Sequence, residues 1–146
     1  ETIAKILSHF EDSSVEIVNI MTSLVSYDQF IDKNNVKVVV DYNSDALYFS
    51  RAPIPFPWKG IKNLSMYIQT GIIAFRREAL LKFNSMDETI LEQTEAVDMN
   101  RVLEMGGSIR MVVTESRTIG VDTPQELKDS EELMRNDSTL AQYQTL

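Results

Sequence analysis

Few side chains in this sequence can do chemistry, and the candidates are charged residues at positions that interrupt regular structure. The 146 residues include one histidine, His9, and no cysteine. The lack of cysteine excludes disulfides, thiolate catalysis and zinc–thiolate sites, and a single histidine argues against Ser/His triads and histidine metal clusters. We expect His9 to be a surface residue. Any bound metal would have carboxylate ligands, which Mg²⁺ and similar hard cations prefer.

Arg51 is the first candidate, because it ends an apolar strand pattern and precedes Ala52-Pro53. Its planar guanidinium could bind a carboxylate or a phosphate through two parallel hydrogen bonds. The alternative is a surface arginine on an edge strand, and the local sequence leaves both interpretations open. Neither a GxGxxG nor a GxxxxGK[ST] motif is present, so no familiar phosphate-binding loop can be assigned.

Asp122 is the second candidate, within the segment IGVDTPQEL. Thr123 can cap a helix whose first residue is Pro124, and Glu126 completes a capping box. Asp122 is not needed for this cap. It is either a turn residue or a metal ligand at the end of a short apolar run, and the local sequence alone favours the turn residue without excluding the ligand.

A charged helix face is the third feature. Glu95, Asp98 and Arg101 follow one another at spacings of three, so the first two share a face of a predicted helix. Paired acids of this kind usually form a solvated stripe. Met99, together with Val102 and Leu103, has the spacing of a core residue.

Periodic hydrophobic patterns predict the helices and strands that position these residues. We expect helices over 1–10, 77–83, about 95–105 and 123–135, strands over 15–21, 69–75, 108–113 and 118–121, and a hairpin of strands flanking a turn at 43–45. Ser26–Asn35 has a loop composition, and Pro53–Pro57 predicts a rigid extended loop. This order indicates an α/β layered fold with a mostly parallel sheet, carrying a β-hairpin arm around residues 36–52.

Composition limits the possible functions. With 43% hydrophobic and 25% charged residues, the chain has the composition of a globular domain. A net charge of −8 argues against a nucleic-acid-binding surface. No apolar stretch reaches membrane-spanning length, so we expect no membrane association. The absence of cysteine fits a reducing compartment, and we expect a cytoplasmic protein.

Four segments resemble, in order, the 3-deoxy-manno-octulosonate (Kdo) cytidylyltransferases, also called CMP-Kdo synthetases: VKVVVDYNSDALYFSRAPIPFP, GIIAFRREALLKFNSM, EAVDMNRVLEMGGSIRMV and IGVDTPQEL. The resemblance covers most of residues 1–136 and makes them the C-terminal portion of a cytidylyltransferase domain. Residues 137–146 are expected to form a frayed tail. The resemblance implies a nucleotide-diphospho-sugar transferase-like, Rossmann-like fold and a homodimer formed through the hairpin arm.

The resemblance also implies a reaction and its residues. The anomeric hydroxyl of a Kdo-like sugar acid would attack the α-phosphorus of CTP and release pyrophosphate, for lipopolysaccharide synthesis. Arg51 would bind the sugar carboxylate, Asp98 would contact sugar hydroxyls, and Asp122 would be the catalytic Mg²⁺ ligand. Gln69 and Met99 would line the sugar site, where the family commonly has a histidine and a glutamine.

Two departures from the family pattern leave alternatives open. A glutamine at 69 and the sequence VDM at 97–99 resemble the branch that prefers 8-amino-8-deoxy-Kdo. The family's nucleotide-binding motifs, of QGDEP and LPGKPL type, precede the first helix and are not in this sequence, so we expect an N-terminal part to be missing. We then expect the chain alone to be inactive. The alternative is an inactive remnant that acts as a dimerisation or binding module.

Overall fold

The described part of the chain comprises residues 2–60, 66–115, 121 and 124–135 of a computed structural model. It divides into two units, residues 1–116 and 117–146, which we describe separately. The first unit is built on five strands: β1 (Ile17–Ser23), β2 (Lys37–Val40), β3 (Ala46–Ser50), β4 (Tyr67–Phe75) and β5 (Arg110–Val113). Its helices are α1 (Thr2–His9), α2 (Tyr27–Ile31), α3 (Arg77–Ser85), α4 (Ile90–Glu95) and α5 (Met99–Glu104).

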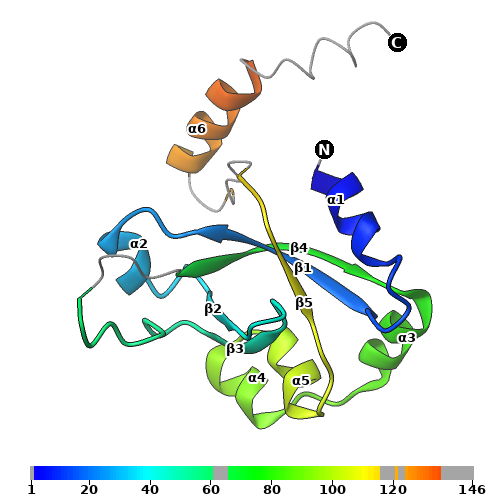
Figure 1. Ribbon diagram of the computed structural model, residues 1–146. Coiled ribbons are helices and arrows are strands. Elements are labelled where there is room, and N and C mark those ends of the chain that lie inside the picture. The colour runs from blue at the N-terminus through cyan, green and yellow to red at the C-terminus, as the bar shows by residue number, and fades with distance from the viewer. Residues whose placement is uncertain (1, 61–65, 116–120, 122–123, 136–146) are drawn as a thin grey trace, which may run out of the picture. The chain divides into compact units, whose positions relative to one another are not determined.

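The strands form one sheet in the order β3-β2-β4-β1-β5 (Figure 1). The predicted α/β fold is confirmed, but the sheet is mixed rather than mostly parallel. Among the described strands only β1 and β5 pair in parallel, whereas β1–β4, β2–β3 and β2–β4 are antiparallel. An apolar run predicts a buried strand but carries no information on its direction, and a parallel neighbour requires a crossover connection.

Each face of the sheet has its own core. On one face, Val18 and Ile20 of β1 pack with Ile6 of α1. On the other face, Ile17 and Met21 of β1 pack with residues of α3, of α5 and of the α4–α5 junction. Of the aliphatic residues of α1, Ile6 is buried while Ile3 and Leu7 are exposed.

The predicted hairpin is present and belongs to the sheet. Its turn includes Ser44 with a positive φ of 65°, and its tip reaches the outer edge of β5. The amide N of Ala46 donates to the carbonyl of Ile109 at 2.9 Å, and the amide N of Met111 donates to the carbonyl of Ser44 at 2.8 Å. Arg110 Nε donates to Asp45 Oδ1 at 2.7 Å and fixes this contact. The hairpin therefore joins both edges of the sheet.

The helix predicted over about 95–105 is instead two short helices. Ala96 has left-handed dihedral angles, φ 51° and ψ 49°, and separates α4 from α5. After this break Val97, Met99, Asn100 and Val102 are all buried. In a continuous helix of 3.6 residues per turn these side chains would point all around the axis, so they could not all face the sheet. Burial of these residues therefore requires the break.

Two further differences concern short segments. The predicted loop over Ser26–Asn35 contains α2, which Ser26 caps by accepting a hydrogen bond from the amide N of Gln29. In the second unit, α6 (Pro124–Arg135) confirms the predicted last helix. Most of the strand predicted at 118–121, the proposed cap at Thr123 and the tail lie outside the described residues.

A buried ion pair ties three helices together. Arg101 Nε of α5 donates to Glu92 Oε2 of α4 at 2.6 Å, and a second nitrogen pairs with Glu92 Oε1. Arg101 also donates to the carbonyl of Met86, and its guanidinium lies 4.8 Å from the ring centroid of Phe83. The hydrogen bonds from Arg101 hold the pKa of Glu92 below its usual value, against the opposing effect of burial.

Replacing this arginine should lower stability. We expect Arg101→Lys to reduce the free energy of unfolding by roughly 1.5–3 kcal/mol, because lysine cannot make the bidentate pair and the carbonyl contacts together. Urea denaturation followed by circular dichroism would measure the change. Arg77→Lys is the matched control, since Arg77 and Glu78 form a pair with side chains 83% and 80% exposed. An equal loss in both variants would contradict the expectation.

The same pair predicts a pH dependence. Because the pKa of Glu92 is lower in the folded than in the unfolded chain, where it is about 4.3, its contribution to stability is complete above that pH. The contribution is lost as the pH falls through the folded-state pKa, since the unfolded chain then binds more protons. Between about pH 5 and about pH 3, we expect the Glu92→Gln variant to lose less unfolding free energy than the parent protein does. Identical slopes in urea titrations would refute this.

Candidate functional site

The guanidinium of Arg51 is held by backbone carbonyls alone. Nε donates to the carbonyl of Glu95 at 2.8 Å and a terminal nitrogen donates to that of Ala96 at 3.1 Å. The other terminal nitrogen donates to the carbonyl of Lys33 at 3.0 Å. A guanidinium has five N–H groups, so one N–H remains on each terminal nitrogen. Two N–H groups on adjacent nitrogens are the requirement for bidentate binding of one carboxylate or phosphate.

Within the described residues, Arg51 forms no ion pair with a carboxylate. The described ion pairs within 4.0 Å use Arg77, Arg101, Arg110 and Arg135. Among the described arginines, Arg51 and Arg76 have carbonyl partners without a carboxylate partner. Arg76 differs because one of its terminal nitrogens donates twice, to the carbonyls of Phe10 and Asp12. Its free N–H groups are therefore on a single nitrogen and cannot bind an anion in bidentate geometry.

The backbone of Arg51 is fixed on both sides. Its amide N donates to Glu95 Oε2 at 2.9 Å, and its carbonyl accepts from Lys37 Nζ at 2.6 Å. Lys37 Nζ also donates to the carbonyls of Asp32 and Asn35, so its three donors are all used although the residue is fully buried. Burial lowers the pKa of Lys37.

The carboxylate of Glu95 is the centre of a polar cluster. Oε1 accepts from Ser50 Oγ at 2.7 Å and from the Tyr48 hydroxyl at 3.2 Å. Burial alone would raise the pKa of Glu95, but the hydrogen bonds from Ser50, Arg51 and Tyr48 outweigh it and hold the pKa low. Burial, together with the charge of Glu95, raises the pKa of Tyr48. The cluster thus contains an ionised glutamate and a neutral tyrosine at neutral pH.

Strand register places this cluster at the carboxyl end of β1. Lys37 pairs with Ser50 in β3 and with Ile68 in β4. Ile68 in turn pairs with Thr22, near the end of β1. β1 and β5 are the parallel pair of the sheet, and α/β proteins bind ligands beyond the carboxyl ends of their parallel strands.

The other predicted sugar-site residues lie in different environments. Gln69 of β4 is half-exposed and pairs with Met21, so both side chains project on the face of the sheet that carries Met99. Met99 is 1% exposed and lies in that core. Asp98 is exposed at the start of α5 and makes no side-chain cap hydrogen bond. The guanidinium of Arg51 lies at the α4–α5 junction, where it contacts the carbonyls of Glu95 and Ala96. Asp98 and Met99 follow this junction shortly after in the sequence.

The predicted metal ligand, Asp122, lies outside the described residues. In the part of the chain that is described, no group of three or more His, Asp or Glu side chains could hold a metal ion. No helix among the described residues combines the length and the apolar character needed to cross a bilayer.

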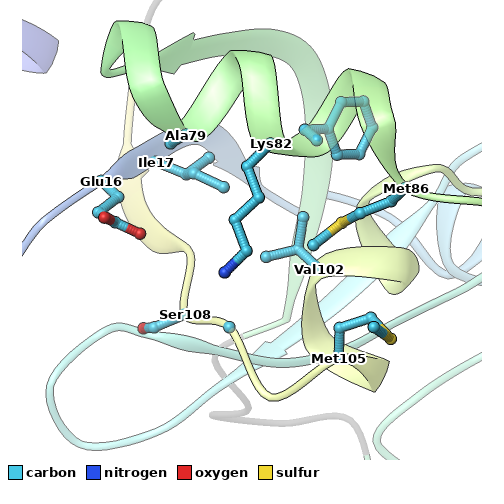
Figure 2. A pocket seen from close by; sticks show the side chains of 10 residues that line it. Glu16, Ile17, Ala79, Lys82, Met86, Val102, Met105 and Ser108 are labelled. Carbon is cyan, nitrogen blue, oxygen red and sulfur yellow. The ribbon is translucent and has the colours of Figure 1, made fainter.

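A small hollow lies at the opposite end of β1. Figure 2 shows Lys82 of α3 extending across it, with Glu16 and Ile17 on one side and Val102 and Met105 on the other. It encloses about 40 Å³. Ligand pockets typically measure roughly 300–1,000 Å³, so this hollow is too small to hold a sugar acid. None of the predicted site residues lines it.

Sequence reasoning missed the residues that hold Arg51. Glu95 was assigned to a solvated stripe, and Lys37, Ser50 and Tyr48 were not singled out. Lys37 offered a signal, because it is a charged residue within the otherwise apolar segment NVKVVV. Glu95 offered none, since its role depends on the break at Ala96 and on a contact between residues 44 positions apart.

Known proteins are similar to this chain in sequence and in fold. A family model described as "Cytidylyltransferase" matches residues 1–115. The chain is 35% identical over 136 residues to the 3-deoxy-manno-octulosonate cytidylyltransferase of Flavobacterium johnsoniae, covering 93% of this chain and 56% of that protein. It is 40% identical over 128 residues to the protein of the same name from Geotalea uraniireducens, covering 81% and 51%. The chain thus spans about half the length of these relatives.

Solved structures support the same relationship. CMP:2-keto-3-deoxy-manno-octonic acid synthetase, solved in complex with CTP, aligns with a TM-score of 0.83 at 30% identity, over 92% of this chain and 55% of that one. A putative glucose-1-phosphate thymidylyltransferase from Bacillus anthracis, with a TM-score of 0.60 and 16% identity over 94% of this chain and 51% of its own, shares the fold. The matched residues include every strand of the sheet and the Arg51 cluster, and the chain belongs to the cytidylyltransferase family.

Proposed function

We propose that this chain is the sugar-acid-binding and dimerising portion of a cytoplasmic, CTP-dependent cytidylyltransferase. The complete enzyme would convert Kdo or a Kdo-like sugar acid to its CMP-sugar, with release of pyrophosphate, in lipopolysaccharide synthesis. The observation that carries this proposal is Arg51, whose guanidinium is oriented by three carbonyls and retains one N–H on each terminal nitrogen. The names of the relatives and of the CTP-bound neighbour support the reaction class.

The chemistry of Arg51 suits a sugar acid. A carboxylate takes two parallel hydrogen bonds from a guanidinium, and such charge-assisted pairs fix orientation as well as position. Since nucleotidyl transfer requires one chosen hydroxyl to face the phosphorus, a fixed carboxylate would orient the anomeric hydroxyl of the same sugar carbon. Gln69 and Asp98 would then contact other hydroxyl or amino groups of the sugar.

Magnesium is part of the proposal only through Asp122. In the complete enzyme this carboxylate would hold Mg²⁺, which neutralises phosphate charge during transfer. Because the described residues offer no metal-binding group of three, the support for this role is the family resemblance of the segment GVDTP.

Binding of the sugar acid tests the proposal directly. We expect the chain to bind Kdo in an NMR titration, and Arg51→Lys to weaken that binding about tenfold or more, because lysine loses the bidentate contact to a charged group. Arg77→Lys is the control and should bind as the parent does, since Arg77 is exposed and pairs with its neighbour Glu78. Equal affinity for all three proteins would refute the proposed site.

Turnover distinguishes the complete enzyme from an inactive remnant. With CTP, Mg²⁺ and Kdo, we expect this chain alone to release no pyrophosphate, and the same chain joined to the N-terminal half of a curated relative to release it. An inactive fusion that still binds Kdo would favour the binding-module alternative. Replacing Kdo by 8-amino-8-deoxy-Kdo in the fusion decides the sugar, and equal or better conversion of Kdo would sink the amino-sugar hypothesis.

Association through the hairpin is a separate expectation. Tyr42 and Leu47 are exposed apolar residues of the hairpin, and exposed apolar surface commonly marks a partner interface. We expect the chain to sediment as a dimer at micromolar concentration and Leu47→Glu to shift it to monomer. Leu81→Glu, at a similarly exposed leucine of α3, is the control that should stay dimeric. A parent protein that sediments as a monomer would contradict homodimerisation.

A further inference from the structure

We propose that Glu95 is a positioning residue for the Arg51 anion clamp: its carboxylate holds the backbone amide of Arg51 and its carbonyl orients the guanidinium, with no ion pair between the two side chains. The inference rests on the proposed function, since it concerns the residue proposed to bind the substrate carboxylate. Its starting point is that Glu95 contacts Arg51 at two separate places. The carboxylate accepts from the amide N of Arg51, and the carbonyl of Glu95 accepts from Arg51 Nε.

The two contacts together set the direction of the arginine side chain. The carboxylate fixes where the chain leaves β3, because Oε2 lies 2.9 Å from the amide N of Arg51. The carbonyl oxygens of Glu95 and Ala96 fix where the guanidinium ends, 2.8 Å from Nε and 3.1 Å from a terminal nitrogen. Glu95 thus contacts both ends of a long side chain that would otherwise sample many rotamers, with Ala96 and Lys33 completing the contacts of the guanidinium.

The carboxylate is also kept from pairing with the guanidinium. Oε1 accepts from Ser50 Oγ and Tyr48 OH while Oε2 accepts from a backbone amide. Neither carboxylate oxygen of Glu95 lies within 4.0 Å of a guanidinium nitrogen of Arg51 in the described structure. Three hydrogen bonds to neutral groups therefore hold the acid in place, and the positive charge of Arg51 remains available for a substrate anion.

Lys37 completes the arrangement from the other side. Its ammonium donates to the carbonyl of Arg51 at 2.6 Å, so both peptide groups of Arg51 are anchored. Arg76 provides an internal comparison, because its guanidinium is likewise bound by carbonyls but has no contact with Glu95. Arg76 therefore serves as an internal control for any effect on Arg51.

The test measures the arginine side chain itself, in the full chain labelled with ¹⁵N-arginine. We expect Glu95→Ala to accelerate water exchange of the Arg51 Nε–H about tenfold, because a hydrogen bond to a charged group that fixes Arg51 is lost. Exchange of the Arg76 Nε–H should stay unchanged. Kdo binding should weaken by about the same factor, whereas Glu88→Ala, at an exposed acid, should leave both quantities unchanged.

Two milder variants keep the inference open to refutation if Glu95→Ala does not fold. Glu95→Gln should stay within about threefold of the parent, because its amide oxygen can accept from Arg51 and its amide NH₂ can donate to the Ser50 and Tyr48 hydroxyls. Tyr48→Phe, which removes one donor to Glu95, should accelerate Arg51 exchange about threefold and leave Arg76 unchanged.

Three outcomes would overturn the inference: unchanged Arg51 exchange in both Glu95→Ala and Tyr48→Phe, equal acceleration at Arg51 and Arg76, or a Glu95→Gln variant as impaired as Glu95→Ala. The second outcome would make Glu95 a general stabilising residue. Failure of the parent chain to bind Kdo would instead count against the proposed function, while the exchange rates would still decide whether Glu95 positions Arg51.

Discussion

The left-handed backbone at Ala96 is the constraint on which both the core and the site depend. Left-handed angles cost a non-glycine residue about 1–2 kcal/mol. The break they cause allows Val97 and Met99 to enter the core on one side. On the other side it ends α4 so that the carbonyls of Glu95 and Ala96 face the guanidinium of Arg51. Burial and hydrogen bonding together offset the strain, and the same turn assembles packing and chemistry.

Lys37 and Arg51 both donate hydrogen bonds to backbone carbonyls, with different consequences. Lys37 has three donors, and all three are used, which is what full burial of an ammonium group requires. Arg51 has five donors, and three are used. Carbonyl dipoles orient a charge without cancelling it, so the fully bonded lysine is structural while the partly bonded arginine can still attract an anion. The difference lies in the number of free N–H groups and not in net charge.

The elements could largely be predicted from the sequence, because apolar periodicity records burial. The hairpin, β4, α3 and the strand at β5 follow from such patterns, and the resemblance to one family located Arg51. Strand direction could not be predicted, since period-two patterns are the same for parallel and antiparallel neighbours. The division of one helix into α4 and α5 also escaped, because alanine is the best helix former and gives no local signal of a left-handed turn. The role of Glu95 could not be predicted either, because its partners Tyr48, Ser50 and Arg51 are more than 40 positions away in the chain.

Burial at the α4–α5 junction also bears on how a sugar could be selected. Met99 is enclosed in the core, and a thioether there offers a substrate no strong hydrogen bond. Asp98 is exposed, Gln69 is half-exposed, and Arg51 keeps one free N–H on each terminal nitrogen. In the proposed site, Arg51 would bind an anion, which every sugar acid provides. Discrimination between a hydroxyl and an ammonium group would therefore fall to Asp98 and Gln69, and a carboxylate is the group that gains most when a hydroxyl is replaced by a cationic amine.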